Sequence, residues 1–265
     1  MDLEFAQVSD PGRVREHNED YLGHVLPQTQ AEARTHGWLF ALADGVGGQD
    51  RGEVASSTAI ETVISGFREA RAGEALVSLL PRLVETANTR VFEAGLSVGP
   101  AGRSIATTIV TCALRFDRAI VSHVGDSRCY LIRGGDAVSL TRDHTVSSEQ
   151  LRLGLISSRE LREVNTSRLL SRALGNEMFI SVETNEHHVY AGDVLVLCSD
   201  GLHNSISATE IADIANHRSD LQAAAADLVA LAKERDGSDN ISVQMIRIRD
   251  VERVGMYRGR HYKLQ

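Results

Sequence analysis

The sequence predicts an α+β fold in which helices pack on antiparallel β-sheets. Short runs rich in Val, Ile, Thr and Phe recur along the chain, bounded by turn residues, and such runs are typical of strands and hairpins. Segments with the apolar spacing of helices lie between them. Strands cluster and helices occur in pairs, which favours α+β over strict β-α-β alternation. The 265 residues, 42% of them hydrophobic, suit one large domain or two small ones, and we expect one.

Each predicted strand is a short β-type run that ends at turn residues. Turn signals such as segments 116–118 and 133–136 separate neighbouring runs and mark hairpins. In chain order, the predicted strands cover residues 3–8, 38–43, 105–116, 119–124, 128–133, 137–140, 179–184, 193–198 and 241–248.

The predicted helices follow from apolar residues that recur on one face. In the first helix, Ala55, Ala59 and Val63 have this spacing. Pro81 should interrupt or kink the second, because proline lacks the amide donor and clashes with the preceding turn. The last helix stops at Gly237, as at a C-terminal cap. In chain order, the predicted helices cover residues 53–70, 75–95, 147–156, 208–216 and 221–237.

Composition and charge narrow the functional classes. The formal net charge of −8 disfavours sequence-independent nucleic-acid binding, which needs clustered Lys and Arg. Three isolated cysteines, Cys112, Cys129 and Cys198, argue against a disulfide framework and favour a reducing compartment. The apolar runs are of strand length, well below the roughly 20 residues of a membrane span. We therefore expect a soluble, cytoplasmic, monomeric protein: one domain over 1–249 and a short polar tail, peripheral or mobile, over 250–265.

Acidic residues occur at the ends of the predicted strands. Three strands end on an aspartate that a small residue follows, a fourth aspartate precedes the last strand, and an acidic pair lies between the first two strands. Such carboxylates can converge at one rim of a sheet, where divalent cations relieve their repulsion. Oxygen ligands without His or Cys favour Mg²⁺ or Mn²⁺ over Zn²⁺. These acidic residues are Glu19, Asp20, Asp44, Asp126, Asp200 and Asp239.

The alternative is that these aspartates are ordinary turn residues. Asp-Gly is a common turn signal, and Asp236-Gly237 fits a helix end and is left out of the site. The glycines that follow Asp44, at positions 45, 47 and 48, favour a ligand, because a bare backbone lets a carbonyl approach an ion closely. This is not a nucleotide-binding loop, since its spacing is wrong and no lysine follows.

A set of short motifs resembles the signature of a known family. The motifs are RVREHNED, LADGVGG, ATT, VGDSR, TRDHT, CSDGL and SDNIS, and the match extends from Leu3 to Ile248. Their order and spacing resemble those of the PPM (type 2C) family of metal-dependent protein serine/threonine phosphatases. Bacterial members are the most similar, because Val46 stands where many eukaryotic members have a histidine.

The resemblance implies a fold and an activity. The fold would be a central sandwich of two antiparallel sheets, flanked on both faces by paired antiparallel helices in four layers, α-β-β-α. The activity would be hydrolysis of phosphoserine and phosphothreonine by direct attack of a water that bridges two divalent ions, Mn²⁺ or Mg²⁺. Its partners would be phosphorylated proteins, and it would oppose a bacterial serine/threonine kinase.

The resemblance also assigns roles residue by residue. Arg15 matches the arginine that binds the substrate phosphate, Glu19 an acid that acts through water, and Gly45 a backbone-carbonyl ligand. Asp126 matches the ligand of a third, weaker ion that is shared with Asp200. The carboxylates that match the ligands of the two principal ions are Asp20, Asp44, Asp200 and Asp239.

The chain departs from the family pattern at several positions. Ala106 replaces a glycine, which a packed strand should tolerate. Val46 leaves no histidine to protonate the leaving group, so that proton must come from a metal-bound water or another residue. His144 is a candidate by position only, and a structural role is the alternative that we favour. Residues 145–168 correspond to the family's variable flap, which influences substrate choice.

Two alternatives from other functional classes stay open. A phosphatase-like regulator without catalysis would act through protein contacts, and retention of the acids and of Arg15 argues against it. Another dinuclear hydrolase, a phosphodiesterase or a nuclease, is disfavoured by the acidic charge and the missing histidine ligands. Asp126 also has a second interpretation, as a hairpin turn residue that caps backbone amides.

Overall fold

Two antiparallel β-sheets form the centre of the structure, a computed structural model that describes residues 1–46, 51–98, 105–157, 160, 169–252, 254–257 and 260–263. The first sheet comprises, in spatial order, β1 (Asp2–Asp10), β11 (Ile241–Asp250), β10 (Val194–Cys198), β7 (Arg128–Arg133) and β8 (Asp136–Ser139). The second comprises β2 (Asp20–Val25), β3 (Trp38–Val46), β5 (Ile109–Arg115), β6 (Arg118–Val124) and β9 (Glu183–His188), and the short β4 (Ala106–Thr107) pairs with β3.

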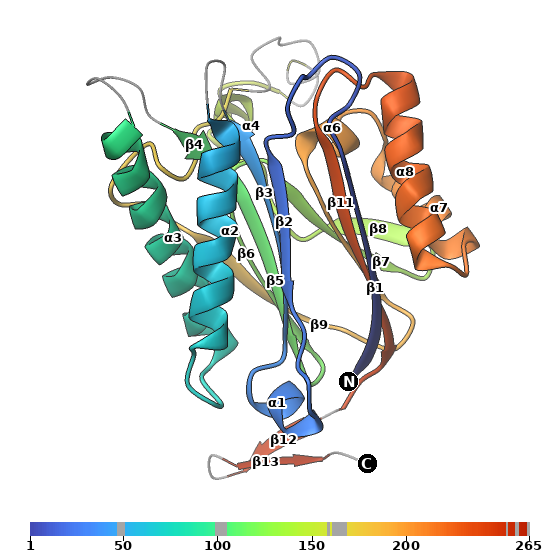
Figure 1. Cartoon of the computed structure of the whole chain (residues 1–265). Coiled ribbons are helices and arrows are strands. Elements are labelled where there is room, and N and C mark those ends of the chain that lie inside the picture. The colour runs from blue at the N-terminus through green and yellow to red at the C-terminus, as the bar shows by residue number, and fades with distance from the viewer. Residues whose placement is uncertain are drawn as a thin grey trace.

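Helices cover the outer face of each sheet (Figure 1). The second sheet carries α2 (Gly52–Arg68) and α3 (Leu76–Val98), and the first carries α7 (Ala208–His217) and α8 (Leu221–Arg235). The predicted four-layer α+β sandwich is therefore confirmed. In the part of the chain that the structure describes, no helix is both long and apolar enough to cross a membrane. The short helices are α1 (Gln30–Thr35), α4 (Val146–Arg152) and α6 (Asp200–His203).

Alternate side chains of one strand pack into two different hydrophobic cores. In β3, Leu39 and Ala41 pack against α2 and α3, whereas Phe40 and Leu42 face the other sheet. Successive side chains of a strand point to opposite faces of its sheet. Because both faces are covered here, the buried strands read as continuous apolar runs. This burial on both faces explains why these strands could be predicted from the sequence.

The helices differ from their prediction at Pro81 and in extent, since α4 ends at Arg152 and not at residue 156, and α1 and α6 were not predicted. The predicted apolar face of α2 is confirmed, since Ala55, Ala59 and Val63 are buried. The predicted interruption at Pro81 is wrong, because α3 continues through it, and the alternative of a kink there stays a prediction. The backbone bond that Pro81 cannot donate would reach the carbonyl of Val77, in the exposed first turn of the helix, where Val77 is 46% exposed. Gly237 has φ +67° after α8, which confirms the predicted cap.

The strand β2 was not predicted, and Asp20 opens this strand instead of lying in a connecting loop. Its sequence, DYLGHV, mixes polar residues with glycine and lacks a clear strand pattern. Gly23 is needed for packing, because a Cβ there would lie 2.4 Å from the side chains of Ile60 and Ile64 on α2. Contact with a distant helix therefore explains the glycine.

The strand predicted over 179–184 begins only at Glu183. Just before the predicted strand, Asn88 Nδ2 of α3 donates to the carbonyls of Glu177 at 2.9 Å and Met178 at 3.1 Å. These bonds hold residues 177–178 against the helix.

A hairpin follows the last strand of the sandwich. The strand β11 extends to Asp250, which pairs with Asp2, and β12 (Val254–Tyr257) then pairs with β13 (Arg260–Lys263). The hairpin lies apart from both sheets, beyond α1 (Figure 1). It was not predicted, and the division of the chain at residue 250 stays a prediction.

Candidate metal centre

Five aspartates lie at one end of the sandwich. Asp20 opens β2 and pairs across the sheet with Asp44 near the end of β3. Asp126 follows β6, Asp200 follows β10 as the first residue of α6, and Asp239 precedes β11. The helix α6, the first turn of α2 and the start of β11 all lie at this end of the molecule (Figure 1). The structure thus brings together the aspartates that the sequence placed at strand ends.

The charges of these aspartates act on one another. Burial, followed by the charges of the other four, raises the pKa of Asp44 well above its ordinary value. Burial and the charges of Asp200 and Asp239 raise the pKa of Asp20 to about 7. Burial, followed by the charge of Asp200, raises the pKa of Asp126 to about 7 as well. A divalent cation would reverse these shifts, because it stabilises the ionised form of each carboxylate.

One carboxylate oxygen of Asp20 lacks a hydrogen-bond partner. Ser199 Oγ donates to Asp20 Oδ2 at 2.8 Å, whereas the buried Oδ1 has no partner among the described residues. A buried polar atom without a partner costs roughly 1–3 kcal/mol, and a bound cation would supply the partner. The five aspartates offer only carboxylate oxygens as ligands for a cation. The residues present therefore fit a hard divalent cation such as Mg²⁺ or Mn²⁺.

Gly45 lies where β3 closely approaches the start of α2. Its N–H donates to the Glu19 carbonyl at 3.1 Å, and a Cβ at Gly45 would lie 2.5 Å from the Gly52 backbone. Gly52 N in turn donates to Glu19 Oε1 at 3.3 Å, and burial raises the pKa of Glu19. Packing alone thus requires a glycine at position 45. Its role as a carbonyl ligand stays a prediction, and the glycines at 47 and 48 lie outside the described residues.

Arg15 forms a bidentate pair with Asp239. The Arg15 Nε lies 2.9 Å from Asp239 Oδ1, and Nη2 donates to Oδ2 at 3.0 Å. The Arg15 side chain is 44% exposed. The residue predicted to bind phosphate therefore contacts a carboxylate predicted to bind a metal ion. The sequence did not show this contact, because the two residues are 224 positions apart.

Asn240 is a residue of the site that sequence reasoning missed. Its Oδ1 accepts from Glu19 N at 2.8 Å, and its Nδ2 donates to the carbonyls of Pro11 and His17, both at 3.0 Å. All three bonds reach the loop between β1 and β2, so Asn240 fixes that loop beside Asp239. The available signal was its place directly after Asp239 in the SDNIS motif.

Asp126 lies in the turn between β6 and β7. Its side chain is 8% exposed, and His203 Nε2 donates to its carbonyl at 2.9 Å. Gly125, just before it, has φ +105°. Arg128 Nε and Nη2 donate to Asp143 Oδ1 and Oδ2 at 2.8 and 2.6 Å. The turn is therefore anchored by α6 and by the TRDHT segment, which suits either interpretation of Asp126. Sequence reasoning missed His203.

His144 is enclosed by the protein and uncharged at neutral pH. Its side chain is fully buried, and burial, followed by the charges of His123 and Arg172, lowers its pKa to about 4. Its Nδ1 accepts the N–H of Gly125 at 3.2 Å. A neutral, enclosed imidazole is poorly suited to protonate a leaving group at neutral pH. The structural role favoured for His144 is therefore supported.

His123, His144 and Glu183 form a second group of potential metal ligands, with ligand atoms within 4.8 Å of one another. Their hydrogen bonds argue against a cation here. Because His144 Nδ1 accepts from Gly125, the ring proton lies on Nε2, the atom that faces Glu183 Oε2 at 3.3 Å. Arg142 also donates to Glu183 at 2.9 Å. We therefore interpret this group as a hydrogen-bonded cluster.

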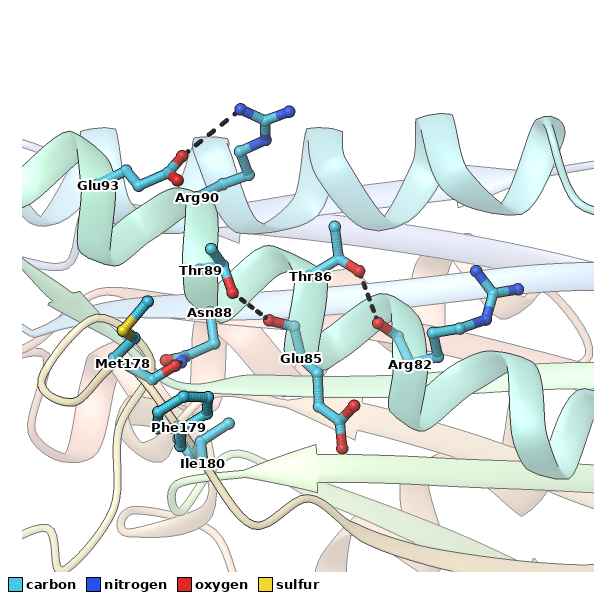
Figure 2. A pocket seen from close by; sticks show the side chains of 10 residues that line it. All are labelled: Arg82, Glu85, Thr86, Asn88, Thr89, Arg90, Glu93, Met178, Phe179 and Ile180. Atoms are coloured by element: carbon cyan, nitrogen blue, oxygen red, sulfur yellow. Dashed lines mark hydrogen bonds and ion pairs between the residues drawn. The ribbon is translucent and has the colours of Figure 1, made fainter.

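A surface groove of about 610 Å³ lies on another part of the molecule, between α3 and residues 178–180 (Figure 2). Phe179 in this groove is 83% exposed, and Arg90 pairs with Glu93 at 3.5 Å on the helix surface. None of the five aspartates lines the groove. The groove is therefore not part of the candidate metal centre.

Known proteins are similar to this chain in sequence and in fold. The family model described as protein phosphatase 2C matches residues 7–241. The chain is 32% identical over 266 residues to the serine/threonine phosphatase Stp of Listeria welshimeri, which covers 98% of this chain and 99% of that protein. The Mycobacterium tuberculosis serine/threonine phosphatase PstP/Ppp is similar in structure, with 30% identity, a TM-score of 0.81, and coverage of 93% of this chain and 99% of that one. A catalytic domain of PstP in complex with two manganese ions has 30% identity, a TM-score of 0.78, and coverage of 94% and 99%.

Proposed function

The chain belongs to the protein phosphatase 2C family and is a phosphoprotein phosphatase, and from this premise we propose that it hydrolyses phosphoserine and phosphothreonine in proteins by direct attack of water. We propose that two principal Mn²⁺ or Mg²⁺ ions, and a third, weaker one, bind at the end of the sandwich. One observation carries the proposal: five aspartates from separate strand ends lie together there, at the positions of the family motifs.

The cation ligands would come from four strand ends and one turn. The unpartnered Oδ1 of Asp20 and the raised pKa of Asp44 support this assignment. Manganese in the related PstP catalytic domain supports the kind of ion. Cations bound here would lower the pKa of a water molecule and offset negative charge on the phosphoryl oxygens. The proposed ligands are Asp20, Asp44, Asp200, Asp239 and the Gly45 carbonyl for the principal ions, Asp126 with Asp200 for the third, and Glu19 through water.

The described cysteines support direct attack by water. Cys112, Cys129 and Cys198 are buried and form no disulfide. Burial raises the pKa of Cys198 to about 12, and a hydrogen bond with Cys112, together with burial, raises the pKa of Cys129 well above its ordinary value. A cysteine nucleophile must be an accessible thiolate. None of the three meets this requirement, so no covalent phosphocysteine step is proposed.

Arg15 would bind the substrate phosphate. Its planar guanidinium has parallel N–H donors that match two phosphoryl oxygens. In the structure these donors contact Asp239, but an exposed ion pair contributes only ~0–1 kcal/mol, so a phosphate can displace the carboxylate. Rotation of Arg15 towards phosphate would also release Asp239 Oδ2 for a cation, while Oδ1 would keep its bond from Asn240 N–H at 3.0 Å. One side-chain movement would thus prepare two binding sites.

The proposed partners are phosphorylated proteins of a bacterial cytoplasm. We propose that the protein acts as a monomer and opposes a serine/threonine kinase. Bacterial relatives named serine/threonine phosphatases support this role. The free cysteines suit a reducing compartment.

Release of inorganic phosphate from a phosphothreonine peptide tests the proposal. We expect turnover with Mn²⁺, a large loss in Asp44→Asn, and normal turnover in Asp136→Asn, a matched change at an exposed aspartate outside the site. A phosphodiester such as bis-p-nitrophenyl phosphate, tested beside the peptide, would detect a diesterase. A folded protein that releases no phosphate from phosphoserine or phosphothreonine peptides with Mn²⁺ or Mg²⁺ would instead be a non-catalytic regulator.

A further inference from the structure

His144 binds the Gly125 peptide at both of its polar atoms. Its backbone N–H donates to the Gly125 carbonyl at 2.9 Å, and its ring Nδ1 accepts from Gly125 N–H at 3.2 Å. Gly125 directly precedes Asp126, so both bonds act on the turn that carries the Asp126 carboxylate. A single buried side chain therefore contributes to holding this turn in place.

The turn at Gly125 needs such support. Gly125 has φ +105°, and a Cβ there would lie 2.6 Å from the Thr108 side chain. Glycine adopts this conformation readily but also loses the most conformational freedom when it is fixed. The bonds from His144, with the His203 Nε2 bond to the Asp126 carbonyl at 2.9 Å, hold the turn on both sides of the Gly125–Asp126 link.

Neighbouring residues hold the His144 ring in one tautomer. Because Nδ1 accepts from Gly125, the proton of the neutral ring lies on Nε2, which faces Glu183 Oε2 at 3.3 Å. Arg172 Nη1 lies 3.4 Å from the same Nε2, but a guanidinium can only donate and so forms no hydrogen bond with it in this tautomer. The ring stacks on that of His123, with a centroid distance of 4.7 Å and an interplanar angle of 15°. Arg142 donates to Glu183 at 2.9 Å and fixes the carboxylate in turn. Residues of β6 and β9 therefore orient the acceptor that Gly125 uses.

His144 also lies at the base of segment 145–170, which contains the predicted flap over 145–168. Its carbonyl accepts from Ser171 N at 2.8 Å, and Val146 N donates to the Leu169 carbonyl at 2.8 Å. The chain thus enters and leaves this segment beside His144. Residues 158–159 and 161–168 of the segment lie outside the described residues.

We propose that His144 is a positioning residue for Asp126 that acts through the Gly125 peptide and links the base of segment 145–170 to the third cation site. The assignment of Asp126 as a cation ligand rests on the proposed function. The role needs no change in the protonation of His144. It uses only the Nδ1 acceptor, the backbone N–H and the fixed place of the ring.

Two substitutions separate the roles of the two ring nitrogens. In His144→Asn, the amide Oδ1 takes the position of histidine Nδ1 and keeps an acceptor for Gly125. In His144→Gln, the amide lies further out, near the position of Nε2, and this acceptor is lost. Calorimetric titration of EDTA-treated protein with Mn²⁺ should leave the weakest site unchanged in His144→Asn. In His144→Gln that site should weaken roughly 10–100-fold, as happens when an outer-shell partner of a metal ligand is removed.

Kinetics and spectroscopy separate positioning from general stabilisation. In His144→Gln, kcat for a phosphothreonine peptide should fall by a similar factor while KM stays unchanged, because Arg15 binds the phosphate. His144→Asn should restore kcat. Urea unfolding in EDTA establishes that each variant is folded. The ¹⁵N spectrum of the wild-type protein should show an unprotonated Nδ1 for His144, a measurement that requires no variant.

Distinct results overturn the proposal. Equal weakening of Mn²⁺ binding in both variants, or in neither, contradicts it, and so does a proton on His144 Nδ1 in the wild-type protein. A wild-type protein that binds Mn²⁺ normally but releases no phosphate would contradict the proposed function alone. The calorimetric comparison of the two variants would still decide the role of His144 in that case.

Discussion

Replacement of Asp126 by asparagine should stabilise the metal-free protein at alkaline pH while it impairs catalysis. Burial, followed by the charges of Asp200 and Asp143, raises the pKa of Asp126 from its ordinary value of 3.8 to about 7. Its side chain is only 8% exposed, so solvent screens this shift little. Ionised Asp126 is therefore a source of instability whenever no cation is bound. Asparagine has a similar shape and carries no charge.

The size of the effect follows from the pKa shift. Below about pH 4, Asp126 is protonated in both the folded and the unfolded protein and contributes nothing. As the pH rises from 3.8 to about 7, the unfolded chain has lost the proton that the folded chain retains, so stability falls. Above about pH 7 the loss is complete, at about three pKa units of 1.36 kcal/mol each, or about 4 kcal/mol. Asp126→Asn should recover up to this amount at pH 8 and little at pH 4.

Urea unfolding in EDTA at pH 4 and pH 8 measures the difference between wild type and variant. Asp136→Asn, at an exposed position in the next hairpin, is the control and should leave the pH dependence unchanged. Added Mn²⁺ should stabilise the wild-type protein more than Asp126→Asn, because the variant lacks one ligand. Phosphopeptide turnover should fall further than aryl phosphate turnover, since a phenolate leaves with little help from a proton.

One result would refute this reasoning. If Asp126 merely caps backbone amides in the turn, its replacement should cost about 1 kcal/mol at both pH values and leave turnover intact. A variant that is less stable than wild type at pH 8 in EDTA, with normal rates on both substrates, would assign Asp126 to the turn. It would also remove Asp126 from the candidate metal centre.

Three further predictions concern the rest of the site. EDTA should abolish turnover and Mn²⁺ should restore it; turnover in protein shown to be metal-free by elemental analysis would exclude the metal mechanism. Arg15→Ala should raise KM for a phosphopeptide roughly 10–100-fold, the loss of a charge-assisted contact of about 1.5–3 kcal/mol, with a smaller change in kcat; an unchanged KM would leave Arg15 as a partner of Asp239 only. Gly45→Ala should destabilise the protein by about 1–3 kcal/mol in urea, because the new Cβ would lie 2.5 Å from the Gly52 backbone; an unchanged midpoint would contradict that packing.

Local patterning accounts for most of the fold. Residues 38–43 of β3 and all of β10 are apolar, because each strand faces a second sheet on one side and helices on the other. Their periodicity, and that of α2 and α8, depends on residues a few positions apart. The ordered motifs likewise identified the acidic residues that the fold brings together, because each of these residues lies at the end of a strand that the sequence predicts or in a motif beside one. The missed strand β2 shows the limit, since Gly23 makes sense only against Ile60 and Ile64 of α2.

The contacts that give the site its shape were beyond the reach of sequence patterns. Arg15 meets Asp239 across 224 positions, and Asn240 Oδ1 meets Glu19 N across 221. The hydrogen bond from Gly125 N–H to His144 requires Nδ1 of the ring to be unprotonated, which is true of only one tautomer. No periodicity encodes such pairs, because strand register and the packing of distant segments set which polar atoms meet. The sequence motifs therefore predicted which residues are candidate ligands, whereas tertiary packing determines which hydrogen bonds hold each ligand and which neighbouring charges shift its pKa.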